Sequence, residues 1–430
     1  MMTILNSKDE NFKQELNKLI NRSNMDMANV MPVVNEIITS IRSRGDAALK
    51  EQIEQFDKWE VNNNLAISTD DMKAAYESID DELKKALKLA YERIKIYHEK
   101  QVEKTWLSFE DNGAVLGQKI SPVDRAGLYI PGGKAAYPSS LLMNAVPAIV
   151  AGVKQIVVCT PAINGKVNTL LLAAMHLLGI QEAYKVGGAS AIGAMAYGTQ
   201  SIKKVDVITG PGNIYVATAK KLVYGDVNID MVAGPSEIGV IADESADARH
   251  IAIDLLSQAE HDELASSFLV TKSQDFAVAV NDAIYAVLSS LEREKIARTS
   301  IDNKAAIIVA KDMDECVDIM NALAVEHLEM ACENPFEYLG RIKHAGAIFL
   351  GHYTPEAIGD YLAGPNHTLP TGGSARFFSP LSVMHFVKRT SIISMSKKAV
   401  NELGDACMAL ARAEGLGAHE LSVKVRQDAK

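Results

Sequence analysis

The feature that most constrains the fold is an alternation of short apolar runs with longer helical patterns from about Val115 onward. Strand-like runs lie at 155–160, 204–209, 236–243, 266–271, 304–310 and 346–350, and helix-like segments lie at 139–152, 168–179 and 213–225. Strands and helices in this order predict parallel sheets with helical crossovers. About nine strands in two groups predict an α/β fold of two doubly wound units, with changes of sheet near 125–130 and 235–240.

Both ends of the chain are expected to be helical. Residues 8–103 carry helical patterns, and after about Ser382 we expect two helices broken at Gly415-Leu416-Gly417. The tail is too short to fold alone, so it is expected to pack on the body or on a partner subunit. With 430 residues the chain is long enough for two domains and a large core.

Composition excludes several functional classes. The net charge of −10 argues against a general binder of nucleic acid or anionic membrane. The N-terminal segment has no basic stretch followed by an apolar core, and no apolar run is long enough to cross a membrane. We therefore expect a soluble, cytoplasmic protein.

The four cysteines carry no recognisable motif. None of them forms a CxxC pair, so neither a zinc ribbon nor a redox pair is indicated. No cysteine lies in a glycine-rich loop that would present it as a nucleophile. They are expected to be thiols without a chemical role in a reducing compartment.

Three glycine-rich turns lie at boundaries between predicted strands and helices: Pro131-Gly132-Gly133, Gly187-Gly188 and Gly210-Pro211-Gly212-Asn213. The last follows a strand and opens a helix, the context in which backbone N–H groups bind phosphate. Tyr215 stands where the third glycine of a dinucleotide fingerprint would be. A nucleotide site and a simple tight turn both remain open.

Several polar side chains are candidates for chemistry. Gln258 and His261 share one face at the end of a predicted helix, where they could hold a metal, orient a substrate or face solvent. The turns Ala233-Gly-Pro-Ser236-Glu237 and Ala363-Gly-Pro-Asn366-His367 are expected at sheet ends, facing the crevice in which open α/β sheets bind ligands. Glu326-His327 offers a general base and a second proton carrier, or an ordinary polar pair.

Further oxygen and nitrogen donors lie toward the C-terminus. Asp360 is a plausible oxygen ligand, and Glu414 and His419 flank the glycine break in the tail, where a histidine usually lies at the surface. Gln258, His261, Asp360 and His419 together supply two oxygens and two imidazoles, a set that suits zinc. No short ligand spacing such as HExxH is present, so spacing alone does not establish the site.

Taken together, seven stretches in order resemble the histidinol dehydrogenase family, the zinc- and NAD-dependent enzymes that end histidine biosynthesis. They are GLYIPGGKAAYPSSLLMNAVPA, VDVITGPGN, IDMVAGPSE, LLSQAEHD, EHLEM, GDYLAGPNHTLPTGGSARF and EGLGAH. The resemblance begins at about Gly127, and the first hundred residues add only a compatible helical pattern.

The resemblance implies the following site residues. One zinc ion per subunit would be held by Gln258, His261, Asp360 and His419, the last donated by the other subunit of a homodimer. L-Histidinol would contact Ser236, Gln258, His261, His327, Asp360, His367, Glu414 and His419. NAD would contact Tyr129, Ser190 and Asn213, although Ser190 stands where the family usually has a glutamine.

The resemblance also implies a reaction order and an architecture. His327 would take the alcohol proton as hydride passes to NAD, and Glu326 would activate water for attack on the resulting aldehyde, with zinc positioning the substrate. A helical arm (1–25), a Rossmann-like domain with zinc and catalytic residues (26–128 plus 239–381), a second such domain for NAD (129–238) and a helical dimerisation tail (382–430) would form an intertwined dimer.

Three other functions compete with this interpretation. A related zinc/NAD dehydrogenase of another polar alcohol, of the sulfopropanediol type, is expected to differ around AAYPSS, AGPSE and AGPNH, which here have the histidinol form. A zinc hydrolase using Glu326 would leave the glycine turns without a role. In a non-catalytic nucleotide-binding scaffold, Glu326→Gln would change no property of the protein.

Overall fold

The computed structural model describes residues 2–22, 27–61, 64–132 and 137–428, so Gly133 of the first glycine turn lies outside the described residues. The chain divides into two compact units. The first comprises residues 1–101 and 124–386, and the second comprises 102–123 and 387–430. In the described part of the chain, no helix is both long and apolar enough to cross a membrane.

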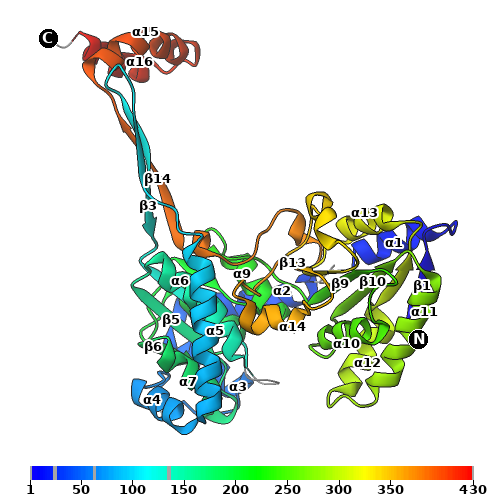
Figure 1. Ribbon diagram of the computed structural model, residues 1–430. Helices are drawn as coiled ribbons and strands as arrows, with labels where there is room; N and C mark the ends of the chain where they lie inside the picture. The colour runs from blue at the N-terminus through cyan, green and yellow to red at the C-terminus, as the bar shows by residue number, and fades with distance from the viewer. Residues whose placement is uncertain (1, 23–26, 62–63, 133–136, 429–430) are drawn as a thin grey trace. The chain divides into compact units, whose positions relative to one another are not determined.

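The first unit contains two parallel sheets, as the alternation of strands and helices predicts (Figure 1). The six-stranded sheet has the order β1 (Thr3–Asn6), β11 (Ala306–Val309), β10 (Ser266–Thr271), β9 (Glu237–Ala242), β12 (His327–Ala331) and β13 (Ala347–Leu350). The five-stranded sheet has the order β6 (Glu182–Lys185), β5 (Gln155–Thr160), β4 (Arg125–Tyr129), β7 (Val207–Thr209) and β8 (Asn228–Ile229). The mixed α/β fold is thereby confirmed.

Burial on both faces explains the six-stranded sheet. One apolar cluster joins alternate strand residues such as Val240 and Leu269 to α10 (Ala248–Ala259), α11 (Gln274–Leu288) and α12 (Glu294–Lys304). The intervening residues, such as Ile241 and Phe268, face α1 (Phe12–Ile20) and α13 (Met313–Leu323). Parallel strands covered on both faces are continuously apolar, which is why they are recognisable in the sequence.

The five-stranded sheet is enclosed by helices from two parts of the chain. α2 (Met27–Arg44) packs on α8 (Gly188–Tyr197) and α9 (Ile214–Val223), and α5 (Asp81–Glu99) packs on α6 (Pro138–Ala151). α3 (Asp46–Phe56), α4 (Thr69–Ser78) and α7 (Thr169–Leu177) complete the cover. The predicted helical pattern of residues 8–103 is confirmed by α1 to α5.

The second unit contains an antiparallel sheet and two helices. β14 (Val387–Ser394) pairs with β3 (Val115–Pro122), which also pairs with β2 (Trp106–Phe109). β14 leads into α15 (Lys397–Ala413), which packs on α16 (Gly417–Gln427) (Figure 1). The two predicted terminal helices and their break are therefore present. The expectation that the chain is helical from about Ser382 is wrong for β14.

Candidate active site

The Glu326–His327 pair lies where α13 connects to β12. His327 is the first residue of β12, in register with Ile238 of β9 and Ala347 of β13. Both side chains of the pair are buried, with residue exposures of 5% and 3%. An acid and an imidazole withdrawn from bulk water in this way are candidates for proton transfer.

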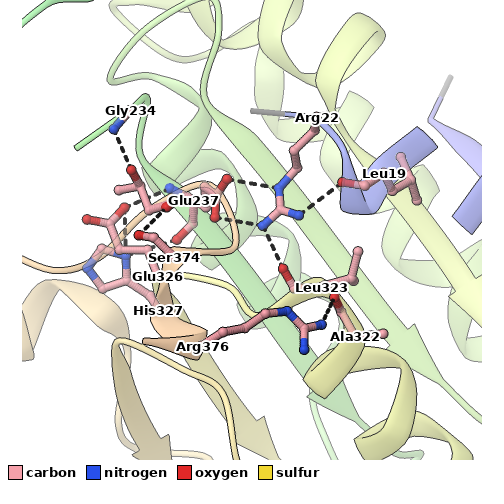
Figure 2. A network of polar contacts seen from close by, with 11 residues as sticks. Leu19, Arg22, Gly234, Glu237, Ala322, Leu323, Glu326, His327, Ser374 and Arg376 are labelled. Carbon is pink, nitrogen blue, oxygen red and sulfur yellow. Dashed lines mark hydrogen bonds and ion pairs between the residues drawn. The ribbon is translucent and has the colours of Figure 1, made fainter. Parts of the chain in front are cut away.

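The main chain of Glu237, at the start of β9, contacts both members of the pair (Figure 2). Its N–H donates a 2.8 Å hydrogen bond to Glu326 Oε2, and its carbonyl oxygen lies 3.0 Å from His327 Nδ1. Because a carbonyl only accepts, this contact is a hydrogen bond when Nδ1 carries the proton. In the neutral imidazole the lone pair is therefore on Nε2, which has no hydrogen-bond partner among the described residues. This is the tautomer that a general base needs.

Three carboxylates surround His327. Its Nδ1 lies 3.7 Å from Glu326 Oε2 and 3.6 Å from Glu356 Oε1, and its Nε2 lies 3.5 Å from Asp360 Oδ1. Burial opposes protonation, but Glu356, Glu326 and Asp360 outweigh it and raise the pKa of His327 well above its usual value. A bound cation would offset this concentration of negative charge.

The same environment perturbs the carboxyl groups. Burial raises the pKa of Glu326 to about 8, against the opposing effects of His327 and the Glu237 N–H. Burial likewise raises the pKa of Glu356 to about 8. Asp360 is half-buried, and although its partial burial opposes ionisation, its contact with His327 and the neighbouring histidines keep its pKa below the usual value.

Asp360 and Glu356 reach His327 from one short segment. Glu356 begins α14 (Glu356–Ile358), and Asp360 lies in the π-helical turn Gly359–Ala363 that follows it. Residues four apart share a helix face. The prediction did not include Glu356, although its spacing from Asp360 was a signal that would have found it.

Gln258 and His261 come from the end of α10 and the turn after it. Gln258 is 1% exposed. Its amide forms hydrogen bonds when its nitrogen faces Glu356, to which it donates at 2.7 Å from Oε1. In that orientation the amide nitrogen, and not the oxygen, faces the Glu356 carboxylate. His261 is exposed in the single chain, yet the surrounding protein atoms lower the pKa of its imidazole, which is close enough to Asp360 and His327 to interact with their charges.

Within the described ranges, one group of acidic and histidine ligand atoms could hold a metal: those of His327, Glu356 and Asp360, which lie within 4.8 Å of one another. Only Asp360 belongs to the predicted zinc set. The carboxylate excess, the amide of Gln258 and the nearby His261 fit a divalent cation bound by oxygen and imidazole donors.

His367 lies close to this group, and Ser236 directly precedes Glu237, whose main chain contacts Glu326 and His327. Ser236 directly precedes β9, and its carbonyl accepts a hydrogen bond from the N–H of Ser266. His367 Nδ1 lies 3.0 Å from the carbonyl oxygen of Asp360, and its Nε2 lies 3.5 Å from the Ser140 hydroxyl on α6. Burial lowers the pKa of His367.

Ser236 does not lie at the sheet edge that its turn predicts. Open α/β sheets bind ligands beyond the carboxyl ends of their strands. Ser236 and His327 instead lie at the amino ends of β9 and β12, because both strands begin there. We expected Ser236 to face the usual ligand crevice, and this expectation is wrong for the six-stranded sheet. Ser236 and His327 lie at the amino edge of this sheet and not at its carboxyl edge.

The cofactor candidates lie at the carboxyl edge of the five-stranded sheet. Its strand order reverses direction between β4 and β7, the position where such sheets bind nucleotides. Tyr129 ends β4, and its hydroxyl accepts a 3.2 Å hydrogen bond from the N–H of Gly188 at the start of α8. The turn that begins at Gly210 follows β7 and opens α9.

Two of these candidates already have internal partners. The Asn213 side chain caps α9, where its oxygen accepts from the N–H groups of Tyr215 and Val216. Ser190 is buried and donates a 2.5 Å hydrogen bond to Gln52 Oε1. These bonds leave the Asn213 amide nitrogen available, whereas the Ser190 hydroxyl proton is engaged.

Glu414 and His419 belong to the second unit. Glu414 ends α15 and His419 lies in the first turn of α16, and both are exposed in the single chain. The first unit thus brings together Gln258, His261, Asp360, Glu326, His327 and His367.

The family model described as histidinol dehydrogenase matches residues 20–427. The chain belongs to the histidinol dehydrogenase family. It is 61% identical to the histidinol dehydrogenase of Sulfurimonas denitrificans over 99% of both chains, and 61% identical to that of Wolinella succinogenes over 98% of both.

A solved structure shows the same relationship. The crystal structure of histidinol dehydrogenase from Elizabethkingia anophelis matches with a TM-score of 0.94 and 36% identity, over 99% of this chain and 98% of that one. The family resemblance and the expectation of an oxidoreductase are confirmed. Membership implies use of NAD, a small-molecule substrate and a place in histidine biosynthesis. It favours histidinol dehydrogenase over a dehydrogenase of another polar alcohol.

Proposed function

We propose that this histidinol dehydrogenase homologue oxidises L-histidinol to L-histidine through L-histidinal, in two successive steps that each reduce one NAD+. The observation that carries the proposal is the buried Glu326–His327 pair, whose tautomer and position are set by the main chain of Glu237. Two steps need two proton acceptors, and the pair supplies both within one site.

In the first step, His327 acts as general base. Its Nε2 accepts the hydroxyl proton while the C–H bond breaks and hydride passes to NAD+, which leaves the aldehyde, NADH and a proton on the imidazole. Positioned bases of this kind increase rates by ~10²–10⁴-fold. The carboxylates of Glu326, Glu356 and Asp360 stabilise the imidazolium that forms, because each lies within 4 Å of the ring nitrogens.

In the second step, Glu326 acts on water. Its carboxylate accepts a proton from a water that attacks the aldehyde carbon, and the resulting hydrate loses hydride to a second NAD+. The products are the carboxylic acid, NADH and a proton. None of the three cysteines of the first unit is needed: Cys159, Cys316 and Cys332 are buried with raised pKa values.

We propose that zinc is held by Gln258, His261 and Asp360 together with the partner subunit's His419. A bound zinc ion would orient the amino and imidazole groups of the substrate and offset the negative charge around His327. Ser236, His367 and Glu414 would complete the substrate contacts, and Tyr129, Ser190 and Asn213 would contact NAD.

The homodimer is supported by the second unit, which displays apolar side chains in the single chain. Phe109 is 75% exposed, Ile393 69% and Leu410 68%. Large exposed apolar groups gathered on one small unit are typical of an interface. We propose that they are covered in a homodimer, and that the enzyme works in the cytoplasm.

The test is the stoichiometry of the reaction. Zinc-loaded protein is mixed with limiting L-histidinol and excess NAD+, NADH is followed by absorbance, and the product is identified by mass spectrometry. We expect about two NADH per L-histidinol and L-histidine as the product, because the chemistry comprises two hydride transfers. Absence of turnover with L-histidinol, together with rapid oxidation of a sulfonated diol, would reverse the assignment.

A further inference from the structure

A buried ion pair includes Glu237, whose main chain contacts the catalytic pair. Arg22 follows α1, and its Nε and Nη2 donate to the two carboxylate oxygens of Glu237 at 2.8 and 2.7 Å. The two side chains are 7% and 3% exposed. Burying two charges is costly before their attraction is counted, because both lose their hydration. Such a pair persists only where its remaining hydrogen bonds are satisfied.

The Arg22 guanidinium is satisfied by main-chain groups on two elements (Figure 2). Its Nη1 donates to the carbonyl of Leu19 and its Nη2 to the carbonyl of Leu323, both at 3.0 Å. The guanidinium also lies 5.0 Å from the ring centre of Phe268. It therefore links the end of α1, the end of α13 and the start of β9.

These linked points flank the catalytic pair. Leu323 ends α13, and Glu326 follows three residues later, after Ala324 has turned the chain through a left-handed conformation with φ of 49°. Glu237 contacts Glu326 through its N–H and His327 through its carbonyl. The guanidinium thus fixes both the segment that carries Glu326–His327 and the strand residue that orients it.

We propose that Arg22 is a positioning residue for both oxidation steps, holding Glu237 so that its main chain sets the tautomer of His327 and the orientation of Glu326. The inference rests on the roles proposed for Glu326 and His327. Arg22 itself touches no reacting group. Its loss is expected to lower kcat and to leave substrate binding by the other residues intact.

The experiment compares zinc-loaded, full-length Arg22→Gln and Arg22→Lys with a matched control, Arg125→Gln. Arg125 forms a similar pair with Glu182, and its side chain is also 7% exposed. Arg125 is the first residue of β4 and Tyr129 is the last, so Arg125 lies at the amino edge of the five-stranded sheet, away from the proposed cofactor site. We measure kcat and KM for L-histidinol and for L-histidinal at saturating NAD+, with zinc content and Tm.

We expect Arg22→Gln to lower kcat for both substrates by roughly tenfold or more, with KM changed by less than about twofold, because groups that orient reacting residues typically contribute 10–100-fold. Arg22→Lys keeps the charge but not the two-pronged contact, so its kcat should be intermediate. Arg125→Gln should lower Tm comparably and leave kcat unchanged.

Unchanged kcat in Arg22→Gln, or a loss no larger than that of Arg125→Gln, would overturn the inference. If Arg22→Gln does not fold, wild-type kcat in Arg22→Lys would overturn it equally. Glu326→Gln and His327→Asn are assayed in parallel. Wild-type rates in these two would instead refute the proposed catalytic roles, so that the two failures are distinguishable.

Discussion

At the scale of single residues, one hydrogen bond decides what His327 can do. The carbonyl of Glu237 fixes the proton on Nδ1 and leaves Nε2 as the basic atom. The sequence shows that an acid and an imidazole are adjacent, but it does not show which imidazole nitrogen can accept a proton. That information depends on Glu237, which is about 90 residues away along the chain.

The two members of the pair should be separable by mutation. We predict that His327→Asn slows L-histidinol oxidation at least about 100-fold while zinc still binds, because the base is lost and no proposed ligand is changed. Glu326→Gln should slow L-histidinal oxidation more than L-histidinol oxidation. Single-turnover rates with each substrate provide the measurement, and equal losses in both steps for Glu326→Gln would exclude its role in activating water.

The pKa of Glu326 predicts a pH dependence. Glu326 must be ionised to accept a proton from water, and burial raises its pKa to about 8. We therefore expect the rate of L-histidinal oxidation to rise with pH, with a midpoint no higher than about 8, because the zinc ion proposed for this site would favour the carboxylate. The residual activity of Glu326→Gln should lack this rise. The same rise in both proteins would assign it to another group.

At the scale of elements, sequence patterns were informative where burial is two-sided. β5, β7, β9, β10, β11 and β13 each lie within a predicted apolar run. β14 was missed because its residues, VKRTSIIS, are largely exposed and its partner β3 lies some 270 residues earlier. β1 was missed because it has only four residues and pairs with β11 about 300 residues later.

The site was predictable to a similar extent. Gln258, His261, Glu326, His327 and Asp360 carry distinctive residue types in distinctive stretches, and the fold brings them together. Glu356 was marked only by its spacing of four residues from Asp360. Arg22 lies in no distinctive stretch, because its importance comes from contacts with distant elements. The proposed domain boundaries at 128 and 238 remain a prediction.

The glycine turn after β7 offers a prediction for an element. Gly210 has φ of 123°, and a Cβ there would lie 2.0 Å from the carbonyl oxygen of Tyr129. Gly210→Ala should therefore force β4 and β7 apart, lowering stability by about 1–3 kcal/mol and raising KM for NAD+. Denaturant unfolding and steady-state kinetics measure the two effects.

Gly225→Ala is the matched control for this turn. Gly225 also has a positive φ, of 106°, but a Cβ there meets nothing within 4 Å. It should show the backbone cost without the change in KM for NAD+. A normal KM for NAD+ in Gly210→Ala would remove this turn from the proposed cofactor site.

At the scale of the whole molecule, the proposed site needs two chains. The first unit supplies Gln258, His261 and Asp360, whereas His419 lies at the start of α16 in the second unit. Donation by the partner subunit makes a strong prediction about mixed dimers. The sequence alone cannot establish this donation, because it does not show whether His419 binds the zinc of its own chain or that of the partner subunit.

We predict that His261→Ala and His419→Ala subunits complement each other. Each variant homodimer lacks a zinc ligand at both sites, whereas a heterodimer purified with two different tags contains one complete site. Its activity should be about half that of the wild-type dimer. An inactive heterodimer would mean that His419 serves the site of its own chain, and an active His419→Ala homodimer would mean that it serves no site.

The most direct measurement of the central claim is a crystal structure of the zinc-loaded dimer with anomalous data at the zinc edge. We predict one zinc per subunit, about 2.0–2.2 Å from the Gln258 oxygen, His261, Asp360 and the partner subunit's His419. An ion bound instead among His327, Glu356 and Asp360, with Gln258 and His261 unliganded, would contradict it.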